Sequence, residues 1–343
     1  MPPLIKYDNG IEIEGLDFHL DAHRRAECSF VSHAHSDHAR KHGRVLATAE
    51  TILMYRRRFP GVPTRALPMN RRIKLGDATV ELFPSGHMLG SVQILIEIKR
   101  TRIVYTGDFK VYPNITCPPI ESRRCDILIM ESTYGDPMYS FPPQNEVYSR
   151  IVGFVKRAQS DGYIPVLAGY AMGKAQEAVC LLQQHGFKVA VDKAVNDINH
   201  LYRASGVKME STDHYLHTSL ENKVVVVCPQ TLREEQFRAL RRKRSLFLSG
   251  WSQGGRGKNN FSTDMGVPLS DHADFTQLIA YIESCSPRKI YTLHGEPKFA
   301  QLLREMGYDA EYLHKGFRSD QTPARPIDIT QPKIAIGTNF ELF

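Results

Sequence analysis

The chain has 343 residues, of which 42% are hydrophobic, and its 44 Lys and Arg residues outnumber 37 Asp and Glu residues, giving a formal net charge of +7. This length and apolar content indicate two domains with substantial cores, and the excess of cations favours polyanionic partners. No apolar run approaches the roughly 18 residues of a membrane span, and the first six residues lack the pattern of a secretion signal. We therefore expect a cytoplasmic protein without a membrane partner. The six cysteines form no Cys-x-x-Cys pair, so we expect reduced thiols.

The first informative element is a strand-like run at residues 28–31 that leads into three histidines and one aspartate within residues 33–38. His33 and His35 are two positions apart, so in an extended segment both side chains point the same way. Asp37 and His38 come after the chain has begun to turn, so their side chains can face a second point. Imidazole and carboxylate ligands suit Zn²⁺, Mn²⁺ or Fe²⁺, and the absence of thiolates argues against a purely structural zinc site. The segment predicts two metal ions; the alternative is a His-rich surface turn.

Three later strand-like runs also lead to a metal-type ligand next to glycine, where the backbone can approach a site closely. Residues 80–83 precede His87, residues 103–106 precede Asp108, and residues 290–293 precede His294. Each histidine alone could be an ordinary buried residue. Because the arrangement recurs, we expect all three side chains to reach one site.

Two further segments offer an acid–base pair. A strand-like run at residues 126–130 delivers Glu131, and residues 270–274 contain His272. A buried glutamate beside a histidine raises the histidine pKa by stabilising imidazolium, which yields a general acid able to protonate a leaving alkoxide. The alternative is that Glu131 caps a turn and His272 caps a helix beginning near Ala273.

The segment 169–176 follows a strand-like run and contains two glycines and Lys174. Glycine-rich turns at a helix N-terminus bind phosphate, and a lysine adds charge. The spacing is one residue short of a nucleotide-hydrolysing P-loop, and Ala175 stands where Ser or Thr is required, which argues against an NTPase. We expect Lys174 to contact a backbone phosphate, away from the metal ions; the alternative is an ordinary surface lysine.

Between residues 163 and 248, strand-like and helix-like segments alternate, which predicts a parallel α/β module. One predicted helix covers residues 232–243, so the basic run 241–244 closes a helix. Because His272 and His294 must return to the site formed by residues 33–131, we expect an insertion. The predicted division is a first domain segment at residues 1–135, an inserted domain at 136–265 and a second segment of the first domain at 266–343.

The histidine-rich segment resembles the signature of the metallo-β-lactamase superfamily, and Glu131-Ser-Thr-Tyr-Gly, the 169–176 segment and Ser270-Asp-His-Ala-Asp resemble its β-CASP nuclease branch. The resemblance implies an α/β fold, an αββα sandwich with an inserted parallel α/β (β-CASP) domain. It further implies one metal ion held by His33, His35 and His87, another held by Asp37, His38 and His294, and Asp108 bridging both. It also implies a role for Asp21 in orienting the ligand loop.

The resemblance covers nearly the whole chain and is greatest to the DNA-ligase-associated exonucleases of prokaryotes. It implies two divalent ions, Zn²⁺ first and Mn²⁺ second, and a metal-bound hydroxide that attacks the phosphate of DNA. It also implies repair partners such as a DNA ligase or helicase. The residues implied to act on the substrate are the catalytic Asp37, Glu131 and His272 and the substrate-binding Lys174 and Ser270. RNA cleavage is the main alternative, because RNA-processing members also keep the histidine at position 294. A non-catalytic binding module fits less well, because every expected metal ligand is present. A small-molecule hydrolase fits less well, because it would need no α/β module in the middle of the chain.

Overall fold

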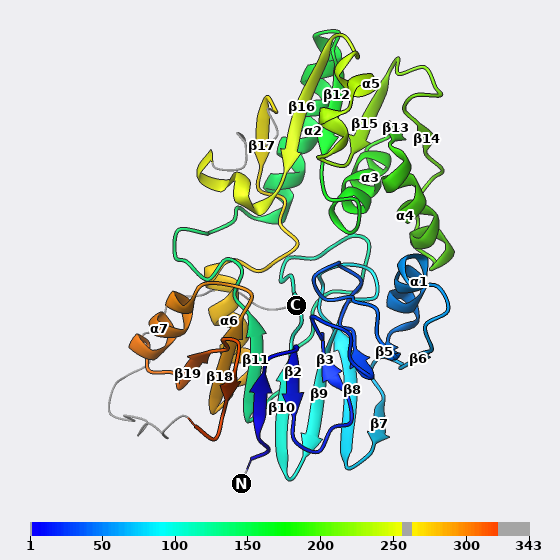
Figure 1. The fold of residues 1–343 in the computed structure, drawn as a ribbon. Coiled ribbons are helices and arrows are strands. Elements are labelled where there is room, and N and C mark those ends of the chain that lie inside the picture. The colour runs from blue at the N-terminus through cyan, green and yellow to red at the C-terminus, as the bar shows by residue number, and fades with distance from the viewer. Residues whose placement is uncertain (1, 256–262, 322–343) are drawn as a thin grey trace.

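The structure is a computed structural model and describes residues 2–255 and 263–321. Within these residues the strands form three sheets (Figure 1). The first sheet has the order β20-β1-β2-β3-β4-β5-β6. Its strands are β1 (Ile5–Tyr7), β2 (Ile11–Ile13), β3 (His19–Leu20), β4 (Cys28–Phe30), β5 (Arg44–Ala47), β6 (Thr64–Ala66) and β20 (Phe317–Arg318).

The second sheet has the order β19-β18-β11-β10-β9-β8-β7. Its strands are β7 (Arg72–Leu75), β8 (Ala78–Pro84), β9 (Val92–Ile98), β10 (Thr101–Tyr105), β11 (Ile127–Glu131), β18 (Lys289–Leu293) and β19 (Ala310–Tyr312). The third sheet has the order β14-β13-β15-β12-β16-β17. Its strands are β12 (Ile164–Ala168), β13 (Lys188–Val191), β14 (Asp213–His214), β15 (Lys223–Val227), β16 (Lys243–Leu248) and β17 (Met265–Val267).

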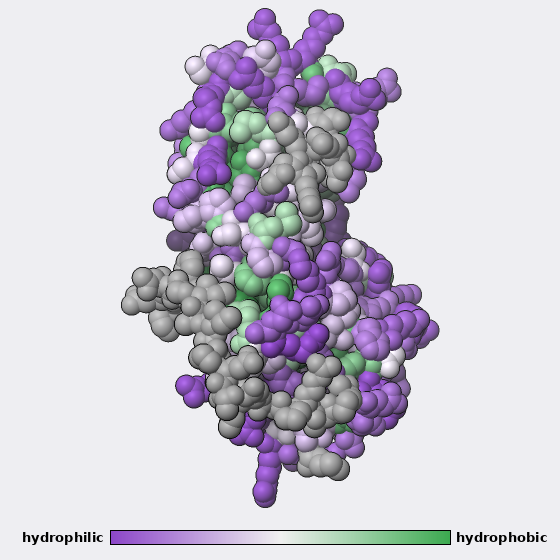
Figure 2. Space-filling model, turned by 90° about the vertical axis from the view of Figure 1, so that its left-hand side faces the viewer, coloured by the Kyte–Doolittle hydropathy of each residue, from purple (hydrophilic) through white to green (hydrophobic). Residues whose placement is uncertain are grey.

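Helices cover the sheets. They are α1 (Ala49–Arg58), α2 (Gln144–Ser160), α3 (Lys174–Gln184), α4 (Lys193–Ala204), α5 (Glu235–Arg238), α6 (Phe275–Cys285) and α7 (Pro297–Glu305), with short 3₁₀ turns η1 (Thr231–Arg233) and η2 (Gly250–Gly255). Among the described residues, no helix combines the length and apolar character that a membrane crossing requires. On the face shown in Figure 2, hydrophilic side chains predominate and apolar residues gather in smaller patches between the two ends of the molecule.

The first two sheets pack face to face around one core. Alternation along β9 shows why: Ile94 and Ile96 point into the core between the sheets, whereas Leu95 points to the opposite face, toward α6 and α7. Successive residues of a strand face opposite sides, so an apolar strand can bury both. On the other side of the sandwich, Tyr55 of α1 packs with Val45 of β5. The αββα sandwich is therefore confirmed.

The third sheet is parallel at every strand pairing, as predicted for the middle of the chain. Residues of α2, α3 and α4 pack on it in one apolar cluster. One element was predicted wrongly: residues 232–243 do not form a single helix. They contain the last two residues of η1, the four-residue α5 and the first residue of β16. Lys243 instead continues the parallel ladder beside Ile164 of β12, so the basic run 241–244 belongs to a turn and a strand.

The chain leaves the second sheet after β11 and returns to it at β18, with the third sheet formed in between (Figure 1). The strands β11 and β18 pair in parallel, from Ile127 beside Lys289 to Glu131 beside Leu293. Parallel neighbours place their carboxyl ends at the same edge, which brings Glu131 next to the segment that carries His294. We propose residues 136–265 as the inserted domain on this basis, with β17 extending the third sheet two residues further, to Val267.

Candidate active site

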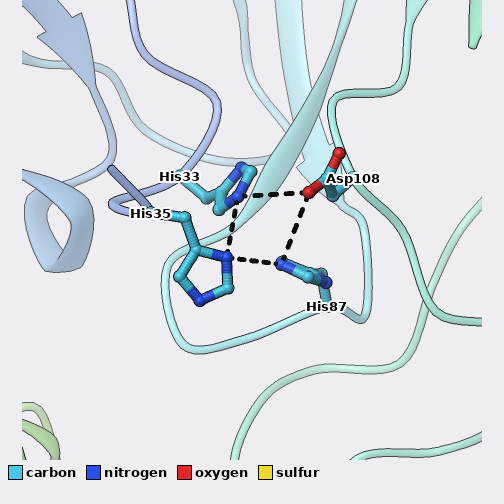
Figure 3. A group of neighbouring side chains, drawn as sticks. All are labelled: His33, His35, His87 and Asp108. Atoms are coloured by element: carbon cyan, nitrogen blue, oxygen red, sulfur yellow. Dashed lines mark hydrogen bonds and ion pairs between the residues drawn. The ribbon is translucent and has the colours of Figure 1, made fainter. Parts of the chain in front are cut away.

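Three histidines and one aspartate converge from three loops at one edge of the sandwich (Figure 3). The Nδ1 atom of His35 lies 3.1 Å from Nε2 of His33 and 3.0 Å from Nε2 of His87. A carboxylate oxygen of Asp108, which follows β10, lies 3.5 Å from Nε2 of His33. All four donor atoms lie within 4.8 Å of one another. We call this group the first cluster.

The outward-facing nitrogens of the same rings are held by the protein. His35 donates from Nε2 to the carbonyl oxygen of Met172 at 3.1 Å, and His87 donates from Nδ1 to the carbonyl oxygen of Asp271 at 2.7 Å. A carbonyl oxygen only accepts hydrogen bonds, so the inward nitrogens of these two rings carry lone pairs. Burial keeps both rings neutral: it lowers the pKa of His35, and it lowers that of His87 to about 3. Lone pairs that converge in this way fit a bound cation.

A second cluster comprises Asp37, His38 and His294. Nε2 of His38 lies 3.4 Å from one oxygen of Asp108 and 3.9 Å from Asp37. The rings of His38 and His294 stack at 4.7 Å between centroids. Among the described residues, the buried Nε2 atom of His294 has no hydrogen-bond partner, and Nε2 of His38 and Oδ1 of Asp108 are ion-paired at 3.4 Å without a hydrogen bond. Unpaired buried polar atoms are rare, and a metal ion would satisfy all three.

Two details show how tightly the second cluster is built. His294 has a positive φ of 56°, a strained conformation that persists where surrounding structure requires it. Asp21 lies beneath His38 and accepts hydrogen bonds from Nδ1 of His38, the backbone N–H of Ser32 and the hydroxyl of Tyr105, each at 2.7 Å. Burial opposes a charge on His38, but Asp108 and Asp21 outweigh it and hold its pKa well above the usual value. A metal ion binding here would therefore displace a proton.

The acid–base residues lie beside the first cluster. Nδ1 of His272 lies 2.8 Å and 3.0 Å from the two carboxylate oxygens of Glu131, and the His272 ring is 4.9 Å from that of His87. Burial opposes a charge on His272, but Glu131 and then Asp108 raise its pKa to about 9. The helix α6 is capped by Asp274, which accepts from the backbone of Gln277. The alternative in which His272 caps this helix is therefore wrong.

Ser270 shapes the turn that carries His272. Its hydroxyl donates to the carbonyl oxygen of His272 at 2.9 Å and accepts from the backbone N–H of His272 at 3.0 Å. Contact between Ser270 and a substrate stays a prediction.

Lys174 is placed differently from the prediction in one respect. The turn before α3 ends at Gly173, whose φ of +91° favours glycine, and Met172 in that turn contacts His35 directly. The segment is therefore next to the metal clusters and not away from them, because the carboxyl end of β12 faces the sandwich. Lys174 is 4% exposed, and its ammonium lies 2.6 Å from Asp271. Burial opposes a charge on Asp271, but Lys174 lowers its pKa to about 2.

Three residues that support the site were not predicted from the sequence: Thr133, Lys110 and Glu177. Thr133 donates to Glu131 at 2.6 Å, and its place two residues after Glu131 was the available signal. The buried ion pair between Lys110 and Glu177, at 2.7 Å, joins the loop after β10 to α3. Nothing in the sequence pairs two residues that are 67 positions apart.

The two clusters open into one cleft of about 960 Å³. The sandwich contributes ligand and acid–base residues to its wall, and the third sheet contributes loop residues. The lining includes His35, Asp37, Asp108, His272, His294, Arg58, Tyr170, Lys174 and Trp251. Cations and aromatic rings next to metal-type ligands suit a phosphate-bearing substrate better than an apolar one.

Comparison with known families and proteins agrees with this site. Residues 267–313, which include His272 and His294, match the family described as "Zn-dependent metallo-hydrolase RNA specificity domain". A "Probable DNA ligase" of Opitutus terrae is 34% identical over 98% of this chain, which spans 34% of that relative. The "DNA cross-link repair protein SNM1" of Arabidopsis thaliana is 24% identical over 81% of this chain and 64% of its own length. The "Probable RNase MJ4" of Methanocaldococcus jannaschii is 24% identical over 71% of this chain and 69% of its own length.

A solved structure of a protein of unknown function from Enterococcus faecalis has the same fold, with a TM-score of 0.57, 15% identity and coverage of 85% of this chain and 80% of that chain. The chain thus spans about a third of the Opitutus relative and matches relatives along most of its own length. Together with the sandwich, the third sheet and the converging ligands, these matches show that the chain is similar to DNA-ligase-like, SNM1-like and RNase-like proteins of the β-CASP metallo-β-lactamase group.

Proposed function

We propose that this chain is a metal-dependent phosphodiesterase that hydrolyses DNA, as an exonuclease in DNA repair. The observation that carries the proposal is the pairing of buried Glu131 with half-buried His272 beside two converging sets of metal-type ligands. Two bound divalent ions, Zn²⁺ first and Mn²⁺ second, would neutralise charge on a phosphate and activate a water molecule. The residues proposed to hold them are His33, His35 and His87 for one ion, Asp37, His38 and His294 for the other, and Asp108 for both.

The chain's own residues would then supply the proton. Nδ1 of His272 donates a hydrogen bond to Glu131. The other ring nitrogen, Nε2, is therefore the one that can donate to a substrate. A histidine protonated at neutral pH can donate to the leaving oxygen as the bond to phosphorus breaks. Glu131 also accepts from the backbone N–H of Phe109 at 2.9 Å, which fixes the carboxylate that orients His272. Asp21 would position His38 in the same way.

The comparisons support DNA first and RNA second. Two relatives carry names that refer to DNA ligation or cross-link repair, whereas the matched family and another relative carry names that refer to RNA. Because the Opitutus relative is named a ligase and is longer than this chain, we propose a DNA ligase as a working partner, with repair helicases as further candidates.

The substrate is tested with end-labelled DNA and RNA of the same sequence, incubated with Zn²⁺ or Mn²⁺. We expect DNA to be cut at least as well as RNA, with products that shorten from one end, and no cleavage with a chelator. Heat-inactivated protein is the control. Cleavage of RNA together with mere binding of DNA would make the chain a ribonuclease that uses the same residues.

The role of Lys174 is tested separately. If its ammonium meets a backbone phosphate, Lys174→Ala should weaken substrate binding and reduce the salt dependence of the affinity by about one phosphate contact. Exposed Lys193, which pairs with Asp197, gives the control Lys193→Ala. Lost metal affinity with an unchanged salt slope would show instead that the Lys174–Asp271 pair only positions the His35 and His87 contacts.

A further inference from the structure

Two exposed aromatic rings line the cleft beside the metal-type ligands. Trp251 in η2 is 42% exposed, and Tyr170 in the turn before α3 is 49% exposed. A ring left in water forgoes the stabilisation that its burial would provide. Single exposed apolar side chains are common, but both of these border the same cleft as His272 and Asp37.

Trp251 is held in place by a buried aromatic cluster. Its ring lies 4.8 Å from that of Tyr134 and 5.5 Å, at 89°, from that of Tyr139. Gly250 permits this close approach, because a Cβ there would lie 2.4 Å from the hydroxyl of Tyr134. The indole is thus supported from within the protein while part of it stays open to the cleft.

The same cluster connects Trp251 to the acid–base pair. Tyr134 contacts Trp251 on one side, and its ring lies 6.0 Å from that of His272 on another. Across the turn before α3, the ammonium of Lys174 lies 5.5 Å from the ring of Tyr170. Aromatic and cationic groups therefore flank the site at which a phosphate would react.

We propose that Trp251 and Tyr170 form a stacking platform for unpaired bases, so that the cleft takes a single nucleic-acid strand. This inference rests on the proposed function and names its substrate form. Aromatic side chains next to cationic groups bind single strands, since every base has a face that stacks. In a duplex these faces are covered by neighbouring bases, so a duplex must open at its end before it occupies the platform.

The chain contains one tryptophan, which makes the platform directly measurable. Selective excitation of Trp251 in the zinc-loaded His272→Ala protein, in which turnover is expected to be strongly reduced, reports on this ring alone. The probes are a thymidine strand of about 12 nucleotides, within the usual site size, a strand of the same length with abasic sites, and a blunt duplex. We expect the thymidine strand to quench the fluorescence, and the other two to quench it much less.

Trp251→Ala, tested in the same background by anisotropy of labelled strands, is expected to lose about 5- to 150-fold in affinity for the thymidine strand. The same substitution should leave affinity for the abasic strand unchanged. Trp251→Phe should keep most of the affinity. If the alanine variant fails to fold, the phenylalanine variant is compared with the unmodified protein instead. The matched control is Tyr163→Ala. Tyr163 is also exposed, but its ring lies outside the cleft and contacts Arg244.

Equal quenching by all three probes, or equal losses for the thymidine and abasic strands, would overturn the platform. Metal-dependent cleavage by the unmodified protein is measured in parallel. If cleavage persists and only the Trp251 results fail, the platform is wrong and the nuclease stands. If the unmodified protein neither binds nor cleaves nucleic acid, the proposed function fails and the platform fails with it.

Discussion

Replacing Asp108 with alanine is expected to weaken metal binding at both positions and to reduce hydrolysis to the background level. One of its oxygens lies 3.5 Å from His33 in the first cluster, and the other lies 3.4 Å from His38 in the second. Removing this carboxylate takes one ligand from each coordination sphere at once. The ligands that remain are the imidazoles and Asp37, which offer less negative charge to the metal ions. Elemental analysis of the purified protein checks the result: two ions per chain before the substitution and at most one after it.

The matched control for Asp108 is Asp213→Ala, which removes an exposed carboxylate paired with Lys223 in the third sheet and should leave the metal content unchanged. Asp21→Asn gives an intermediate case. Asp21 forms a hydrogen bond with His38, and loss of such a supporting contact usually weakens metal affinity by about 10- to 100-fold. A fully active preparation that holds a single ion would contradict the dinuclear arrangement.

The convergence of the metal-type ligands could be predicted because these residues lie at strand ends. In the segment 33–38 the side-chain directions follow from local geometry, and for His87, Asp108 and His294 each strand is readable from its own apolar run. A buried sheet then brings the ends together, as the parallel pairing of β11 and β18 shows. The pairing of Glu131 with His272 could also be expected from the segments that carry these residues, although 141 positions separate them in the sequence.

What the sequence did not reveal depends on contacts between segments that are distant along the chain. The carbonyl of Met172 orients His35 and the carbonyl of Asp271 orients His87, but backbone acceptors carry no side-chain signature. Lys174 looked like a free cation because its partner Asp271 is distant in sequence. The helix predicted at residues 232–243 failed because tertiary pairing with β12 overrode local propensity.

Single alanine variants of Glu131 and His272 are each expected to lose roughly 10²- to 10⁴-fold in turnover while retaining their metal ions. If His272 supplies the proton and Glu131 keeps it there, as proposed, removing either residue leaves the leaving oxygen without a charged donor. The double variant should be little worse than either single variant, as for residues that act as a unit. Steady-state turnover and metal content, measured on the same preparations, check both points, with exposed His200→Ala as the control.

The pH dependence gives an independent test of the same pair. Since the pKa of His272 is raised to about 9, the ring carries its proton at neutral pH and loses it as the pH rises through that value. Turnover should therefore fall on the alkaline side near pH 9, and this fall should be absent in His272→Ala. A substrate with a much better leaving group needs less protonation and should rescue His272→Ala more than the unmodified protein. Additive losses in the double variant, or no rescue, would separate the two residues and remove the acid role from His272.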